Sequence, residues 1–149
     1  MKTTCTILLA AILLASSCVS LQTPDGYASR KQTGWHEYKA ISTEGAVIAM
    51  RVERNEDKER GTLAYWTEAS RKQMTLSRGY ELQKEGEFTS GEGKGRWMLF
   101  GHKYKGVDFL YLLGLVVDGR KIYVLEATGE KETFEADVPR VVQAFGTLD

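Results

Sequence analysis

Cysteine is scarce in this chain of 149 residues, and both cysteines, Cys5 and Cys18, lie among its first eighteen positions. Residues 19–149 therefore contain no thiol, which excludes a disulfide, a cysteine nucleophile and a thiolate metal ligand from that part of the chain. Histidine is equally rare. His36 and His102 each stand beside a predicted strand rather than in paired ligand spacing. The sequence therefore predicts no metal site and no cofactor.

An excess of charge of either sign is also missing. The chain has 20 basic and 20 acidic side chains and a formal net charge of zero. Nucleic acids and anionic lipid surfaces attract proteins through an excess of positive charge. We therefore expect no nucleic-acid partner and no general electrostatic affinity for a membrane.

A hydrophobic run long enough to span a membrane is the third absence. The apolar run from Ile7 to Ala15 falls well short of the roughly 20 residues that a hydrocarbon core requires. A core helix would carry polar residues at helical spacing, and this run has none. Lys2 precedes the run and small residues follow it, which is the layout of a secretory signal peptide.

The end of this segment is more specific. Residues 14–18, Leu-Ala-Ser-Ser-Cys, resemble the lipobox of bacterial lipoproteins, although Ala15 stands where leucine is commoner. The resemblance implies a signal peptide over residues 1–17, cleavage before Cys18 and attachment of a diacylglycerol to that cysteine. Two or more acyl chains give stable membrane attachment. An ordinary secretory signal with an incidental cysteine is the alternative.

The resemblance also bears on localisation. Val19, rather than aspartate, follows the cysteine. In a Gram-negative host this is similar to lipoproteins that are released to the outer membrane and face the periplasm. Residues 18–33 are polar, contain a Pro-Asp-Gly turn signal and lack periodicity, which predicts a lipidated N-terminus followed by a flexible tether. About 15 flexible residues would span roughly 20 Å.

Residues 34–149 form one predicted domain. Both faces of the strand predicted within residues 106–117 are apolar, so this strand belongs in the middle of a sheet that is covered on both sides. Short turns join the later strands, which favours antiparallel neighbours. We predict an α+β fold, a three-layer α/β/α sandwich with a mainly antiparallel sheet of about six strands and two helices. The expected strands are 35–41, 46–54, 79–85, 95–104, 106–117 and 120–127, and the expected helices are 62–74 and 138–145.

Several stretches carry a family resemblance. "GTLAYWTEA", "GYELQKE" with a glycine-rich hairpin leading to "GRWMLFGH", "KIYVLEATG" and "FEADVPRVVQAFGTL" are similar to the PsbP-like family, over residues 35–148. The resemblance implies the same fold and a non-catalytic scaffold that binds other proteins. The family includes an extrinsic subunit of photosystem II and a nuclear-import factor that binds a small GTPase. Its bacterial members are mostly of unknown function.

Two groups of residues are candidates for a functional surface. Trp35, His102 and Tyr104 would form a protein-binding patch if they were exposed together, since aromatic residues dominate interface hot spots. Core packing is the alternative for Trp35. Glu85 and Glu87 alternate on one strand as a carboxylate pair would, but a solvated strand end explains them equally well.

These observations support three functional hypotheses. The leading one is a lipid-anchored envelope protein that binds another envelope protein or supports an assembly at the membrane surface. The alternative is a carrier that holds a small molecule or lipid in a cavity between sheet and helix. An enzyme is the third, and we expect none because no nucleophile and base occur at a recognisable spacing.

Overall fold

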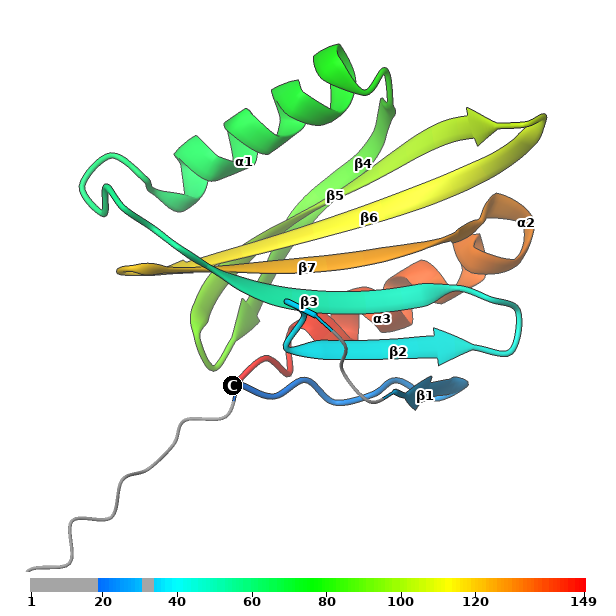
Figure 1. The fold of residues 1–149 in the computed structure, drawn as a ribbon, viewed down its shortest axis with the longest axis horizontal. Helices are drawn as coiled ribbons and strands as arrows, with labels where there is room; N and C mark the ends of the chain where they lie inside the picture. Colours follow the sequence, from blue (N-terminus) through cyan, green and yellow to red (C-terminus); the bar gives the residue numbers. More distant parts are fainter. Residues whose placement is uncertain (1–18, 31–33) are drawn as a thin grey trace, which may run out of the picture.

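The computed structural model describes residues 19–30 and 34–149. They form one sheet of seven strands in the order β1-β2-β3-β7-β6-β5-β4, and every neighbouring pair is antiparallel. Helix α1 lies on one face, and α2 and α3 lie on the other (Figure 1). The strands are β1 (Tyr27–Ser29), β2 (Tyr38–Ser42), β3 (Val47–Arg54), β4 (Glu81–Ser90), β5 (Gly93–Tyr104), β6 (Val107–Asp118) and β7 (Lys121–Glu130).

The first helix is α1 (Leu63–Lys72). Thr62 caps its start, because the Thr62 hydroxyl accepts a hydrogen bond from the backbone N–H of Tyr65 at 3.2 Å. Asp137 precedes the last helix but caps nothing; its carboxylate accepts a hydrogen bond from the Tyr27 hydroxyl at 3.0 Å instead. The other helical segments are the π-helical turn Gln73–Ser77, α2 (Lys131–Phe134), the 3₁₀ turn Glu135–Asp137 and α3 (Val138–Phe145).

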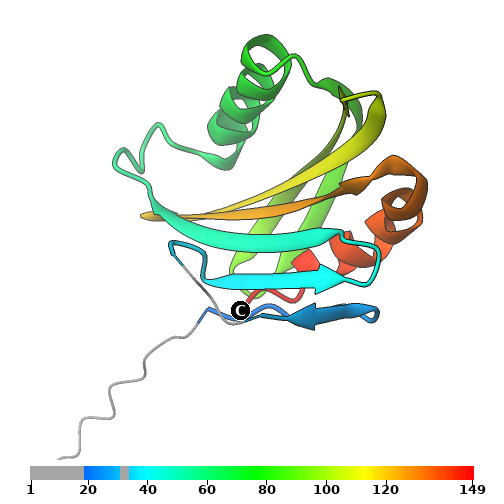
Figure 2. The same ribbon diagram turned by 45° about the vertical axis from the view of Figure 1, so that its right-hand side comes forward.

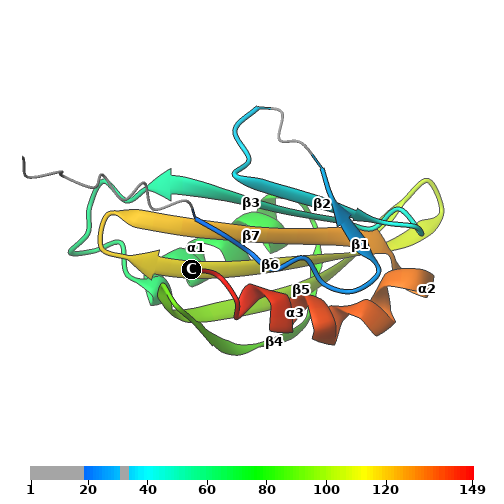
Figure 3. The ribbon, with the colours of Figure 1, turned by 90° about the horizontal axis from the view of Figure 1, so that it is seen from below.

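The predicted α+β sandwich is confirmed, with one strand more than expected. Strand β1 comes from residues 18–33, for which the sequence predicted a flexible tether. Residues 19–30 instead run alongside α3 and the C-terminus (Figure 3). Contacts of Ser20 and Leu21 hold these residues on the domain. Leu21 is buried, and the backbones of Ser20 and Asp149 exchange hydrogen bonds of 2.8 and 3.2 Å.

Strand β6 is covered on both faces, as its apolar pattern predicted. Leu110, Leu112 and Val116 belong to the larger core, which also contains Phe145 of α3. Leu113 and Leu115, which alternate with them, belong to a second core that includes Met74. The sheet therefore separates two apolar layers, one under each helical cover.

Helices α1 and α3 differ in how many of their side chains are buried against the sheet. Helix α3 buries Val138, Val141, Ala144 and Phe145 within its eight residues, whereas Thr67 is the only fully buried residue of the ten in α1. Because α1 packs mainly against β5 and β6, strands β2 and β3 are left without a helix on that side of the sheet (Figure 2). The loosely packed helix and the open half of the sheet define the region where the candidate site lies.

Candidate binding cleft

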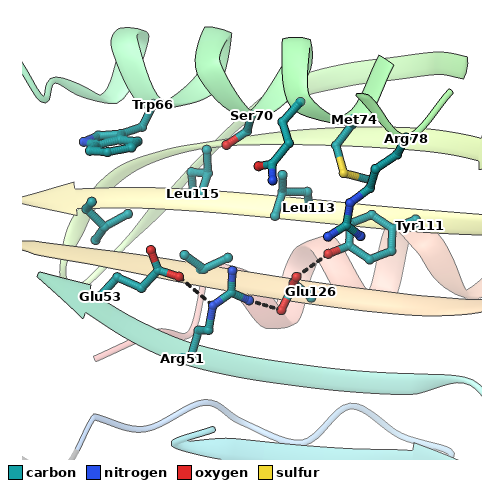
Figure 4. A pocket seen from close by; sticks show the side chains of 13 residues that line it. Arg51, Glu53, Trp66, Ser70, Met74, Arg78, Tyr111, Leu113, Leu115 and Glu126 are labelled. Atoms are coloured by element: carbon teal, nitrogen blue, oxygen red, sulfur yellow. Dashed lines mark hydrogen bonds and ion pairs between the residues drawn. The ribbon is translucent and has the colours of Figure 1, made fainter. Parts of the chain in front are cut away.

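A cavity of about 320 Å³ lies between α1 and the sheet (Figure 4). We call it the α1 cleft. It is lined from one side by α1 and the turn that follows, and from the other by strands β3, β6 and β7. The lining residues are Arg51, Glu53, Trp66, Ser70, Gln73, Met74, Arg78, Tyr111, Leu113, Leu115, Ile122, Val124 and Glu126.

The floor of the cleft is apolar. Leu113, Leu115, Ile122 and Val124 are buried and alternate along β6 and β7 on the face that α1 covers. Trp66 extends from α1 above this floor (Figure 4). Trp66 packs against the core that forms this floor, so a ligand group that enters beside the indole would exchange water for contact with both the ring and the aliphatic side chains.

One edge of the cleft is polar and internally paired. Arg51 on β3 donates from Nε to Glu53 Oε1 at 2.7 Å and from Nη1 to Glu126 on β7. The Tyr111 hydroxyl on β6 donates to the other oxygen of Glu126. Three neighbouring strands thus contribute to one network (Figure 4), and this network satisfies the half-buried charges at the cleft edge.

Tyr111 and Arg51 both stay protonated in this network. Burial, and then the neighbouring Glu126 carboxylate, raise the pKa of Tyr111 far above its ordinary value. Burial lowers the pKa of Arg51, but Glu53 and Glu126 outweigh it and the net shift is upward. Tyr111 therefore remains a hydrogen-bond donor and Arg51 a cation, which suits them to hold a geometry rather than to exchange protons.

Side-chain hydrogen bonds attach helix α1 near both ends, and the cleft extends from Trp66 to the turn that follows the helix. At the start, the buried Asn55 side chain donates to the carbonyl oxygens of Gly61 (2.8 Å) and Gly119 (3.0 Å) and accepts from Trp66 Nε1 at 3.4 Å. Towards the end, Arg71 donates to both carboxylate oxygens of Glu85 on β4, at 3.3 and 2.6 Å.

The helix does not end in regular α geometry. Residues Gln73–Ser77 form a π-helical turn, and Gln73, Met74 and the following Arg78 all line the cleft. Gly79 then takes a positive φ of 70°, which lets the chain leave the helix towards β4. π-Helical turns carry an intrinsic cost and occur frequently at functional sites. Here the irregular turn places an amide, a thioether and a guanidinium at one end of the cleft.

The predicted patch of Trp35, His102 and Tyr104 is not brought together. Trp35 is 86% exposed and precedes the start of β2, whereas Tyr104 is 58% exposed and ends β5. Four antiparallel steps separate these strands, so β2 and β5 run in the same direction and the two residues lie towards opposite ends of the sheet. Core packing, the alternative for Trp35, is also wrong.

His102 and Tyr104 do share a face of β5. His102 is stacked between Tyr80, with ring centroids 4.2 Å apart, and Phe109, at 5.5 Å. Its burial lowers the pKa of the imidazole. His102 is therefore one ring in an aromatic row. Of these two residues of β5, only Tyr104 presents most of its side chain to solvent.

The other candidates have ordinary surroundings or lie outside the described residues. Glu85 is paired with Arg71, and Glu87 with Arg96 at 2.7 Å. Cys18 lies outside the described residues. Within residues 19–30 and 34–149, no group of three or more His, Cys, Asp or Glu side chains is placed to hold a metal ion. The same residues include no helix with the length and apolar character needed to cross a membrane.

Sequence reasoning misses the residues that form the cleft edge. By its sequence, Arg51 belongs to a charged stretch of mixed sign that favours solvent, and Glu126 lies within an apolar strand. Both stand inside strands whose neighbouring positions are apolar, in "IAMRV" and "VLEAT". A charged residue within such a strand requires a buried partner, and this requirement is the available signal.

Comparisons with known proteins place the fold. No family model matches the sequence, and no curated protein matches it. Solved structures do match. LpqN of Mycobacterium tuberculosis, involved in cell envelope biogenesis, is similar with a TM-score of 0.61 and 11% identity, over 87% of this chain and 82% of that one.

Two further structures agree. Cyanobacterial PsbP from Synechocystis has a TM-score of 0.59 and 7% identity, with 89% of this chain and 86% of that chain covered. Protein PA94 from Pseudomonas aeruginosa, of unknown function, has a TM-score of 0.53 and 14% identity, with 86% and 84% covered. At these identities the likeness concerns the fold alone, and it establishes that the chain has a PsbP-like fold.

Proposed function

We propose that this chain is a lipid-anchored protein of the cell envelope that binds another envelope protein without catalysis, and that the α1 cleft is its binding site. The observation that carries the proposal is the cleft itself, which has an aliphatic floor and a mostly polar accessible lining and lies under a loosely packed helix. The lipobox resemblance at Cys18 supports the anchor, with the outer membrane as the destination in a Gram-negative host. The structural likeness to a protein involved in cell envelope biogenesis is in keeping with this setting.

A protein partner fits the surroundings of the cleft. The slot lies beside the half of the sheet that no helix covers on this side, where Ile41, Val47 and Ala49 are half-buried rather than buried. Interfaces combine an anchoring side chain in a pocket with a flatter surrounding surface. An apolar side chain of the partner would enter the cleft beside Trp66, and the rest of the partner's surface would lie against β3 and β2.

A carrier of a small amphipathic molecule is the second candidate. The cavity volume of about 320 Å³ falls at the lower end of the range for small-ligand sites. Its apolar floor would hold the body of such a molecule, and the side chains of Ser70, Gln73 and Arg78 offer polar partners at the rim.

A pull-down from native membranes in mild detergent tests the proposal. The bait would be the wild type, Cys18→Ser to remove the anchor, and Ser70→Phe to fill the cleft from α1. Ala64→Phe is the matched control, because Ala64 is an exposed residue of the same helix. We expect one envelope protein in stoichiometric amount with the wild type and Ala64→Phe, and its loss with both Cys18→Ser and Ser70→Phe.

The other outcomes separate the candidates. A partner retained by Ser70→Phe would contradict the cleft as the binding site. Recovery of no enriched protein, together with a small molecule that co-purifies with the wild type and is absent from Ser70→Phe, would favour the carrier. A wild-type protein recovered without acyl chains would contradict the anchor.

A further inference from the structure

The N-terminal segment of the described chain is fastened to the domain along most of its length. Ser20 pairs with Asp149 through two backbone hydrogen bonds of 2.8 and 3.2 Å, and the Gln22 N–H donates to Thr147 Oγ1 at 2.9 Å. Leu21, between them, is 7% exposed. These contacts hold the start of the segment on the residues that follow α3.

Further hydrogen bonds attach the segment to the domain between Thr23 and β1. The Tyr38 hydroxyl donates to Thr23 Oγ1 at 2.9 Å, and Arg140 donates from Nη1 to the Asp25 carbonyl oxygen at 2.9 Å. The Tyr27 hydroxyl reaches Asp137 at the start of α3. Contacts therefore recur every one or two residues from Ser20 to Tyr27, and the segment is part of the folded unit.

The start of this segment, at Ser20, lies at one end of the sheet. The turn between β4 and β5 lies beside it, because the Gly91 N–H donates to the Leu148 carbonyl oxygen at 2.9 Å, next to the Ser20–Asp149 pair. The β6–β7 turn is at the same end, since Gly95 at the start of β5 is paired with Val116 near the end of β6. The β5–β6 hairpin, which carries Tyr104 and Val107, lies at the far end (Figure 1).

Covalent geometry limits how far an anchor could lie from this end. Cys18 is two residues from Ser20, and a fully extended chain advances at most about 3.6 Å per residue, so their Cα atoms are within roughly 7 Å of each other. Val19, between them, packs against the larger core. A lipid on Cys18 would thus leave almost no free chain, in contrast to the roughly 20 Å of a 15-residue flexible tether.

From this arrangement we infer that the lipid anchor seats the domain directly on the bilayer, with the β4–β5 turn and the C-terminus against the lipid headgroups and the β5–β6 hairpin directed away. This inference rests on the lipidation of Cys18 under the proposed function. A single short attachment permits tilting but keeps the attached end nearest to the membrane. The exposed Tyr104 is then held about 30 Å or more from the attached end, by the length of β5.

The charges at the attached end indicate that the lipid anchor, and not electrostatic attraction, would hold the domain on the membrane. The β3–α1 loop, the β4–β5 and β6–β7 turns, the strand ends next to them and Asp149 together carry six basic and six acidic side chains, so these segments offer anionic lipids little net charge. These side chains are Arg54, Lys58, Arg60, Lys94, Arg120 and Lys121, against Glu56, Asp57, Glu59, Glu92, Asp118 and Asp149. We therefore expect the orientation to be the same on neutral and on anionic membranes.

Site-specific quenching on vesicles tests this seating. The acylated chain would carry Lys94→Cys or Lys103→Cys, two exposed lysines nine residues apart on β5 and so roughly 30 Å from each other. Each cysteine would be labelled with the same fluorophore, and the protein reconstituted into phosphatidylethanolamine–phosphatidylglycerol vesicles that contain a headgroup-quencher lipid. We expect several-fold stronger quenching at position 94 than at position 103.

Two controls make the result decisive. Insertion of 15 glycine and serine residues between Cys18 and Val19 should abolish the difference between the two sites, since the domain would then move freely. The intact mass of the protein reports acylation independently. Equal quenching in an acylated chain without the insertion would overturn the seating and leave the proposed anchor intact, whereas absence of the acyl mass would overturn both.

Discussion

Asn55 shows how one polar side chain can hold three segments together. It is 2% exposed, and its amide connects the end of the loop before α1, the β6–β7 turn and the indole of Trp66 at the cleft. Asn55→Ala would leave two carbonyl oxygens and an indole N–H without partners. We expect the free energy of unfolding to fall by about 2 kcal/mol in urea titrations.

The matched control is the neighbouring surface residue. Glu56→Ala should change the free energy of unfolding by no more than about 0.5 kcal/mol, because Glu56 is exposed. An effect of Asn55→Ala as small as that of the control would show that the three segments are held by other contacts.

His102 provides a prediction on pH. Its burial between two aromatic rings lowers the imidazole pKa below the ordinary value of about 6.5. The folded state therefore binds a proton less readily than the unfolded state, so stability rises with pH across the window just below 6.5 and is lost as pH falls through the folded pKa. An NMR titration of the imidazole, with His36→Asn for assignment, should give a midpoint below 6.5.

Substitution tests the same linkage on stability. His102→Phe keeps the stacking and removes the titrating group, so the unfolding free energy of this variant should vary less between pH 5 and pH 7 than that of the wild type. A midpoint at or above 6.5, or an unchanged pH dependence, would contradict the account of His102.

At the scale of elements, α3 depends on a glycine in the strand beneath it. A Cβ at Gly114 would lie 2.7 Å from Cδ2 of Phe145, closer than packed atoms approach. Gly114→Ala should therefore lower the free energy of unfolding by about 1 to 3 kcal/mol, through overpacking. In thermal melts, adding Phe145→Leu to Gly114→Ala should cost less than the sum of the single substitutions; simple additivity would exclude this contact as the cause.

Most elements could be predicted because their local pattern and their tertiary surroundings agree. The alternation of Leu110, Leu112 and Val116 with Leu113 and Leu115 is enough to identify a strand covered on both faces, and the two cores confirm it. Strand β1 could not be identified in this way. It has three residues and no apolar alternation, and it exists because β2 offers it an edge to pair with.

The sequence allowed a cavity between sheet and helix, but the residues that line the α1 cleft escaped prediction for a related reason. A cavity is a property of how two surfaces fit, and no local pattern encodes the gap under α1. The sequence suggested aromatic residues as a binding surface, but one-dimensional spacing could not tell that Trp35 and Tyr104 lie at different ends of the sheet.

At the scale of the whole molecule, the question is whether the N-terminal segment contributes to the stability of the domain or is only a tether. Substitution of Leu21 distinguishes the two. Because Leu21 packs into the larger core, Leu21→Ala should lower the free energy of unfolding by about 2 to 3 kcal/mol. The adjacent exposed Gln22 is the control, and Gln22→Ala should have little effect. Urea unfolding curves that coincide for the wild type and Leu21→Ala would mean that the segment is a free tether.

The central claim, that the α1 cleft is the binding site of an anchored envelope protein, is tested most directly by photo-crosslinking in native membranes. A photoreactive amino acid at Gln73 would lie in the cleft, and the same residue at Ala64 would lie on the exposed side of α1. We predict a single protein-sized adduct from position 73 and none from position 64. Equal adducts from both positions, or none from position 73, would contradict the account.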